Sequence, residues 1–123
     1  MKQRPFSWSH RIHSFRYAFN GIRDFIFYEH NAWLHLIATV GVIILASAMH
    51  VSKTEWLALV FVTGQVWVAE AFNTCVEKIM DFVSRDKNPD IRFIKDLAAG
   101  GVLIAAITAF ITALIIFIPK FIA

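Results

Sequence analysis

Residues 56–83 read WLALVFVTGQVWVAEAFNTCVEKIMDFV, an apolar run that becomes polar toward its end. Its first fourteen residues are interrupted only by Thr63, Gly64 and Gln65. A helix needs roughly 20 residues to cross a hydrocarbon core about 30 Å thick. The run therefore predicts a transmembrane helix, at about 55–83, that carries acidic side chains in one half.

Two further apolar runs flank this one, and the composition indicates that they also lie in lipid. The chain has 123 residues and is 58% hydrophobic, which is more than a soluble protein of this size needs. The runs predict transmembrane helices at about 32–50 and 96–118, and a very short turn makes the first two spans a hairpin. Pro89 biases Asn88 away from helix and predicts a break in the second loop, at 84–94.

Large apolar residues near the N-terminus recur at steps of four and three, which predicts an amphipathic helix over about 8–28. They are Trp8, Ile12, Phe15, Phe19, Ile22 and Ile26. An aromatic face opposite an arginine-bearing face suits a helix in the membrane interface, although an ordinary packing helix shows the same pattern. We expect an all-α membrane protein, with this interfacial helix and three transmembrane helices in a single domain over 1–123.

The basic residues predict the orientation of the chain. Five lie before the first span and five around the second loop: Lys2, Arg4, Arg11, Arg16 and Arg23, then Lys78, Arg85, Lys87, Arg92 and Lys95. By the positive-inside rule, the N-terminus is cytoplasmic and the C-terminus external, in a multi-pass protein of the cytoplasmic membrane. Nucleic acid is not an expected partner, because both clusters contain acids and flank membrane spans.

Four polar side chains of the second span fall on one stripe. Glu70, Asn73, Glu77 and Asp81 follow steps of three, four and four, so they face the same partner in a helix. An ionised group at the centre of a membrane helix costs about 2.5–3.5 kcal/mol, so pairing with nearby lysines alone explains them poorly. Such a stripe of carboxylates can hold a metal ion together with phosphate oxygens and remove a proton from a hydroxyl. Alternatively, it can carry ions through a transporter.

Other charged residues favour phosphate chemistry. Lys95 and Asp96 lie at the cytoplasmic mouth of the third span, where an ammonium can meet a polyphosphate, and Glu29 lies at the same level before the first. None of the five glycines stands in a Gly-x-x-x-x-Gly-Lys pattern. A nucleotide would therefore bind in an unconventional, membrane-embedded way.

The order of these residues closely resembles the signature of the small prokaryotic diacylglycerol kinase and undecaprenol kinase family. Residues 70–81 read EAFNTCVEKIMD and residues 95–100 read KDLAAG, which match E-x-x-N-T-x-x-E-x-x-x-D and K-D-x-A-A-G. The resemblance extends from FRYAFNG at 15–21 and EHN at 29–31 to the Pro-Lys pair at 119–120.

The resemblance implies a homotrimer whose active sites are shared between neighbouring chains. It also implies transfer of the ATP γ-phosphoryl group to a membrane-lipid hydroxyl, with Mg²⁺ required. By motif position, Glu70 is the base that accepts the hydroxyl proton and Asn73 orients that hydroxyl.

The metal and nucleotide roles also follow from motif position. Glu29 and Glu77 would hold the Mg²⁺ that bridges the phosphates. Lys95 would contact phosphate, with Asp81 and Asp96 on the nucleoside side.

The N-terminal Phe-Asn-Gly and Glu-His-Asn segments look more like the undecaprenol-using branch, so undecaprenol is favoured over diacylglycerol. The chain departs from the family at Asn88, where histidine is common, at Ile94, where a small residue is frequent, and at Gly101, where alanine is usual. We therefore expect no specific nucleotide contact from Asn88 or Ile94. The alternative function is a small ion-coupled transporter or channel subunit that uses the intramembrane carboxylates.

Overall fold

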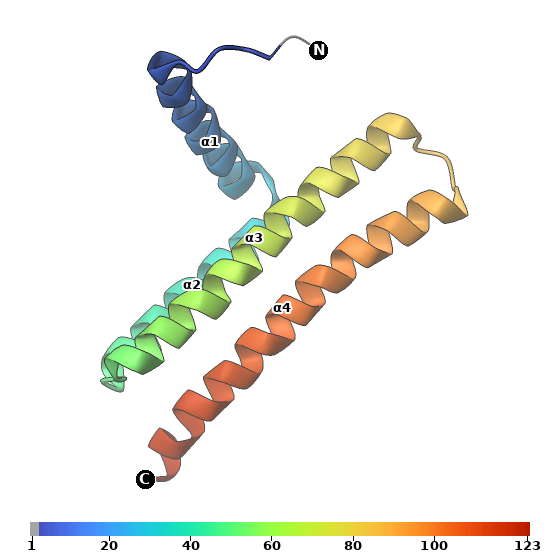
Figure 1. The fold of residues 1–123 in the computed structure, drawn as a ribbon. Coiled ribbons are helices and arrows are strands. Elements are labelled where there is room, and N and C mark those ends of the chain that lie inside the picture. The colour runs from blue at the N-terminus through green and yellow to red at the C-terminus, as the bar shows by residue number, and fades with distance from the viewer. Residues whose placement is uncertain (1–2) are drawn as a thin grey trace. The chain divides into compact units, whose positions relative to one another are not determined.

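The computed structural model describes residues 3–123, and those residues form four α-helices (Figure 1). They are α1 (Trp8–Tyr28), α2 (His30–Ala48), α3 (Lys53–Val83) and α4 (Pro89–Ile122). The last three are long and apolar enough to cross a membrane. The expected all-α fold, with an N-terminal helix and three candidate spans, is confirmed. Lys2 of the N-terminal basic cluster lies outside the described residues.

The chain forms two compact units, Met1–Leu34 and His35–Ala123, with the boundary inside α2. In the first unit, the Ser7 hydroxyl caps α1 by accepting a hydrogen bond from the backbone N–H of His10. The apolar face of α1 is exposed; for example, Trp8 and Phe19 are 75% and 69% exposed. The placement of α1 in the membrane interface, like the single-domain assignment, stays a prediction.

A residue in the left-handed backbone conformation lies in the turn between α2 and α3. His50 has φ 51°, its N–H donates to the Ser47 carbonyl, and the Val51 N–H donates to the Ala46 carbonyl. These two bonds form a Schellman motif, which usually ends in glycine. Val51 is then buried in the core, so the turn is tied to the packing of the hairpin.

Two side-chain hydrogen bonds cap the start of α3 directly after this turn. The Ser52 hydroxyl accepts from the Glu55 N–H, and the Glu55 carboxylate accepts from the Ser52 N–H, which together make a capping box. The Glu55 carboxylate also pairs with Lys120 at the end of α4, at 3.1 Å. The Glu55 carboxylate therefore both caps α3 and pairs with the end of α4.

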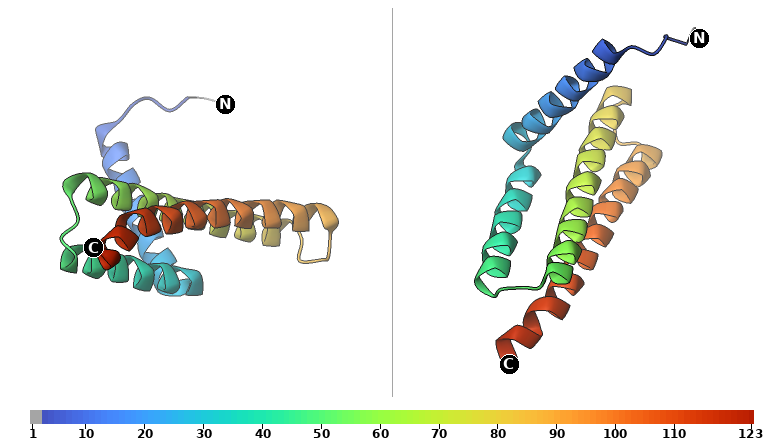
Figure 2. Two further views of the ribbon diagram at one scale, coloured as in Figure 1. Left: turned by 90° about the horizontal axis from the view of Figure 1, so that it is seen from below. Right: turned by 60° about the vertical axis from the view of Figure 1, so that its left-hand side comes forward.

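Within the second unit, α3 and α4 lie side by side and antiparallel (Figures 1 and 2). The core lies at the end that carries the α2–α3 turn, where all three spans contribute side chains. It consists of Ala46, Val51, Leu59, Ile116 and Phe117. Toward the other end of α3, Glu70 and Asn73 are buried, and no residue of the helix beyond Asn73 is.

The start of α4 differs from the expected one at about 96. The helix begins at Pro89, and the Asn88 side chain caps it by accepting from the Asp90 N–H at 2.8 Å. Proline is favoured at the first helical position, because its missing N–H has no intrahelical partner there. The break at Asn88 was predicted correctly, but the proline after it begins the helix. Lys95 and Asp96 consequently lie in the second turn of α4.

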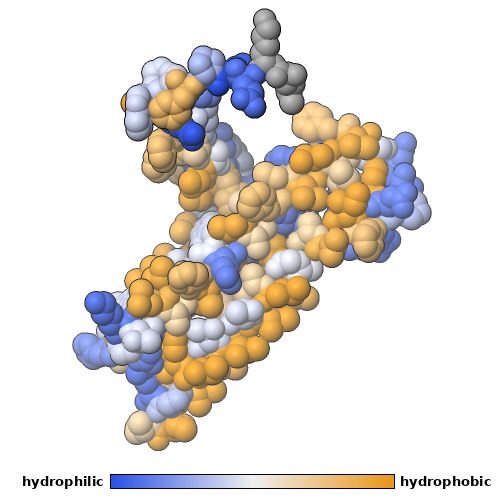
Figure 3. All heavy atoms as spheres, viewed as in Figure 1, coloured by the Kyte–Doolittle hydropathy of each residue, from blue (hydrophilic) through white to orange (hydrophobic). Residues whose placement is uncertain are grey.

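Apolar side chains cover much of the face shown in Figure 3. Only 11% to 17% of the most apolar window of each candidate span is buried within the chain. Exposing apolar surface to water costs about 25 cal/mol per Å². The spans must therefore bury their outer faces against lipid or against other protein chains.

The turn gives a test of the hairpin. His50→Ile should lower the free energy of unfolding by about 1–2 kcal/mol relative to His50→Asn, because a β-branched residue is strained at positive φ whereas asparagine is tolerated there. Thermal unfolding of both variants in detergent micelles measures the difference. Equal midpoints would contradict the left-handed turn.

Candidate functional site

The site is built around two buried polar side chains on one face of α3. Glu70 is 2% exposed and Asn73 is 6% exposed. One carboxylate oxygen of Glu70, Oε2, lies 3.2 Å from Nε2 of His35 on α2. The other oxygen, Oε1, and the Asn73 Oδ1 are buried without a hydrogen-bond partner among the described residues. A buried unsatisfied acceptor costs about 1–3 kcal/mol, so both atoms lack a donor that the described residues do not supply.

A short network joins α2 to α3 beside Glu70. The Thr39 hydroxyl donates to the His35 carbonyl at 2.7 Å and accepts from the Trp67 indole N–H at 2.9 Å. The rings of His35 and Trp67 meet edge to face, with centroids 6.1 Å apart. The imidazole that contacts Glu70 therefore lies against the Trp67 ring of α3, and Thr39 links that indole to the His35 backbone.

Sequence reasoning missed these three residues. His35 and Thr39 are spaced by four in a largely apolar stretch of the first span, and Trp67 comes one turn before Glu70. Polar residues at i and i+4 of a membrane helix share a face, so they could have been predicted to meet the acidic helix.

The stripe becomes exposed toward the end of α3. Glu77 and Asp81 are both exposed, in contrast to Glu70 and Asn73. The Asp81 carboxylate accepts from the Lys95 ammonium of α4 at 2.7 Å. Two of the three residues expected near the nucleotide therefore form an ion pair between α3 and α4.

The remaining predicted residues lie around this pair or in the first unit. Asp96 is exposed and lies 3.8 Å from the Arg92 guanidinium of its own helix. Glu29 ends α1 in the Met1–Leu34 unit, where its backbone N–H donates to the Phe25 carbonyl. Its predicted joint role with Glu77 stays a prediction.

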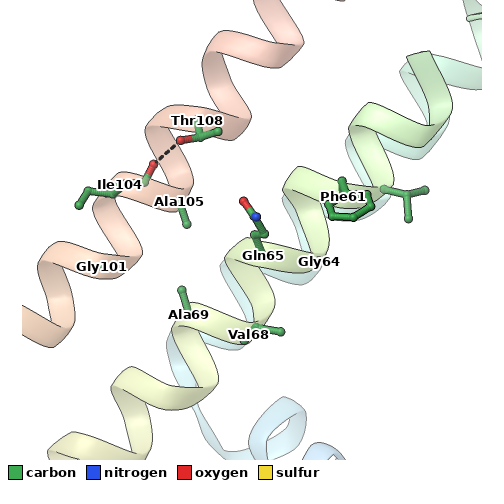
Figure 4. Close-up of a pocket in the computed structure, with 10 residues that line it drawn as sticks. Phe61, Gly64, Gln65, Val68, Ala69, Gly101, Ile104, Ala105 and Thr108 are labelled. Atoms are coloured by element: carbon green, nitrogen blue, oxygen red, sulfur yellow. Dashed lines mark hydrogen bonds between the residues drawn. The ribbon is translucent and has the colours of Figure 1, made fainter. Parts of the chain in front are cut away.

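A groove of about 610 Å³ opens between α3 and α4 (Figure 4). Its walls are mostly apolar, with small residues on both helices and the Gln65 side chain directed into it. A Cβ added at Gly64 or Gly101 would meet no atom of the described chain within 4 Å. The groove therefore has room for a part of another molecule.

These features define the class of protein. It is a helical protein with several candidate membrane spans, whose carboxylates run from a buried position to an exposed end of one span. A sequence profile described as prokaryotic diacylglycerol kinase matches residues 16–117.

Named relatives agree with the profile. The undecaprenol kinase of Bacillus subtilis is 32% identical over 107 residues, which cover 87% of each chain. The diacylglycerol kinase of Synechocystis sp. is 33% identical over 107 residues, which cover 86% of this chain and 61% of that protein.

The chain belongs to the prokaryotic diacylglycerol kinase family. It is a multi-pass membrane lipid kinase, and membership implies ATP as the phosphoryl donor and a membrane lipid as the acceptor. The resemblance predicted from the sequence is confirmed. Membership also favours phosphoryl transfer over the transporter alternative, whereas the roles of individual residues stay predictions.

The Asp81–Lys95 ion pair should contribute little to stability. Both side chains are substantially exposed, at 46% and 35%, and exposed ion pairs typically contribute about 0–1 kcal/mol. A double-mutant cycle with Asp81→Asn and Lys95→Met, read by thermal unfolding, should give a coupling energy below about 1 kcal/mol. A coupling above about 2 kcal/mol would mean that Lys95 is fixed on Asp81 and not available to a phosphate.

Proposed function

We propose that this lipid kinase transfers the γ-phosphoryl group of ATP to the hydroxyl of undecaprenol, with Glu70 as the general base. The observation that carries the proposal is the buried Glu70 carboxylate, which has one oxygen bonded to His35 and the other without a partner in the described chain. A general base must lie within hydrogen-bond reach of the proton that it removes. Oε1 is the oxygen available to do so.

The reaction follows from this placement. The proton of the lipid hydroxyl passes to Oε1 of Glu70 while the lipid oxygen forms a bond to the γ-phosphorus. The bond from that phosphorus to the β–γ bridging oxygen breaks, and ADP leaves. Asn73 lies one turn further along α3 and is also buried, so its amide is suited to orient the hydroxyl beside Glu70.

Magnesium would be held by Glu29 and Glu77. Carboxylate oxygens are hard donors that suit Mg²⁺, and Glu77 is exposed two turns beyond Glu70 on the same stripe. No group of three or more His, Cys, Asp or Glu side chains gathers in residues 3–123. Mg²⁺ usually binds through only one or two carboxylates plus substrate phosphates, so the donor set fits. When bound, the ion neutralises charge on the transferring phosphoryl group.

The nucleotide would lie where α3 and α4 approach the loop. A cleft of about 440 Å³ at the start of α4 is lined by Lys95 and Asp96 among others. The Lys95 ammonium can exchange the exposed Asp81 carboxylate for a phosphate oxygen at small cost. Asp81 and Asp96 would then lie on the nucleoside side.

The orientation in the membrane is part of the proposal. Arg85, Lys87 and Arg92 lie at the α3–α4 loop, which favours a cytoplasmic loop and N-terminus and an external C-terminus. Glu77, Asp81 and the cleft would then face cytoplasmic ATP.

A homotrimer with active sites shared between chains is proposed on the exposure of the spans. The groove between α3 and α4 has open space at Gly64 and Gly101, and small residues let membrane helices approach closely. Glu77 is exposed in the single chain, as a residue that completes a site with a neighbour would be.

Undecaprenol is preferred to diacylglycerol on two grounds. The Phe-Asn-Gly and Glu-His-Asn segments resemble the undecaprenol-using branch. The relative named undecaprenol kinase matches across 87% of both chains, whereas the match to the diacylglycerol kinase covers 61% of that protein.

The substrate is tested directly with purified protein in mixed micelles. Radiolabelled γ-phosphoryl groups from ATP should appear in undecaprenyl phosphate faster than in phosphatidate when each lipid is supplied alone. Faster labelling of diacylglycerol would reverse the preference within the family. No label in either lipid would contradict the proposed function.

Glu77→Gln tests the metal site. The amide keeps the shape but loses the charge, so we expect the Mg²⁺ concentration for half-maximal activity to rise several-fold while the fold is retained, because the helices pack through apolar side chains. A magnesium titration of ATP consumption measures this, with Glu55→Gln as a control at the other end of α3. An unchanged titration in Glu77→Gln would count against the assignment.

A further inference from the structure

The Glu70 carboxylate is held from the neighbouring span. The Glu70 side chain is 3% exposed and the His35 side chain 23% exposed, so the contact between Nε2 and Oε2 at 3.2 Å is largely shielded from solvent. An ionised carboxylate only accepts hydrogen bonds. The proposed base Glu70 is ionised, and the His35 tautomer with its proton on Nε2 is then the one that donates toward Oε2.

Two residues restrain His35, Thr39 through its backbone carbonyl and Trp67 through its ring. Thr39 bonds to its backbone carbonyl from one turn further along α2, and Trp67 bonds to Thr39 from α3. The edge-to-face contact of the Trp67 and His35 rings restricts rotation of the imidazole. The donor reaches Glu70 from a fixed direction.

We propose that His35 is a positioning residue for Glu70: its Nε2–H occupies Oε2 and directs Oε1 toward the lipid hydroxyl. This inference rests on the proposed role of Glu70 as the base. Glutamate has three side-chain torsions, so this bond restricts the rotamers that its carboxylate can adopt. A displacement of about 1 Å in a reacting group can reduce the rate about 10²-fold.

The same bond also satisfies one acceptor of the buried Glu70 carboxylate within the span. A buried carboxylate needs a hydrogen-bond donor, and an imidazole provides one without adding a second acid. In the transfer step, the hydroxyl proton moves to Oε1 and His35 neither gains nor loses a proton. His35 therefore acts through Glu70 and does not touch the substrate.

The kinetics of His35 variants should differ according to whether His35 only stabilises the fold or positions Glu70 for the reaction. Removal of a structural partner lowers stability and leaves the turnover of the folded protein unchanged. Removal of a positioning partner lowers kcat, leaves the KM for ATP unchanged, and is reversed by a side chain that restores the donor. Glutamine can restore it, because its amide nitrogen reaches the place of Nε2, whereas asparagine is one methylene shorter.

The test uses the full-length chain in mixed micelles with saturating Mg²⁺ and undecaprenol. The variants are His35→Leu, His35→Gln, His35→Asn and Glu70→Gln, with His50→Asn as a matched control that removes an exposed imidazole from the α2–α3 turn. We expect His35→Leu and His35→Asn to lose about 10²-fold in kcat with the KM for ATP within about twofold. His35→Gln should recover most of that loss, and His50→Asn should match the wild type.

The outcomes separate the two proposals. If Glu70→Gln is inactive while His35→Leu retains normal kcat, the positioning role is overturned and Glu70 remains the base. If Glu70→Gln is active, both are overturned. Should His35→Leu fail to fold, the comparison of glutamine with asparagine decides, since equal kcat in those two variants would overturn the positioning role.

Discussion

The hydrogen bond between His35 and Glu70 is the constraint on which the rest of the arrangement depends. A carboxylate at the centre of a membrane helix costs about 2.5–3.5 kcal/mol, and a directed donor from a neighbouring span offsets part of that cost. The donor can reach Glu70 only because α2 returns antiparallel to α3. The tight turn at His50 and the core beside it hold that pairing in register.

The change in burial along α3 matches a reaction between a lipid and a water-soluble nucleotide. Glu70 and Asn73 are buried, whereas Glu77 and Asp81 are exposed. In the proposed mechanism, the lipid hydroxyl meets the buried end of the stripe and the triphosphate meets the exposed end. In this mechanism a single face of α3 would extend from the lipid to the aqueous phase, and phosphoryl transfer would occur between Asn73 and Glu77. In the same proposal, the half-buried Lys95 of α4 would contact the phosphates at the exposed end of the stripe.

Much of this could be predicted from the sequence because the information is local to one helix. The steps of three and four from Glu70 to Asp81 place these side chains on one face of a helix. The apolar runs show where the candidate membrane spans lie. Two features could not be found in this way. Periodicity does not say which face of α2 meets α3, so the contact of His35 with Glu70 was missed. The proline at 89 was interpreted as part of a loop, although it begins α4 once Asn88 caps that helix.

The most direct measurement compares activity and stability in the same Glu70→Gln protein. Glutamine keeps the shape of the side chain and removes its basicity and its charge. Lipid phosphorylation should fall by about 10²–10⁴-fold, the usual contribution of a general base. The thermal midpoint should stay equal or rise, because the amide removes a costly charge from the membrane while its oxygen can still accept a hydrogen bond from His35. Near-normal lipid phosphorylation would contradict the account, because positioning and electrostatics would then carry the transfer without this carboxylate.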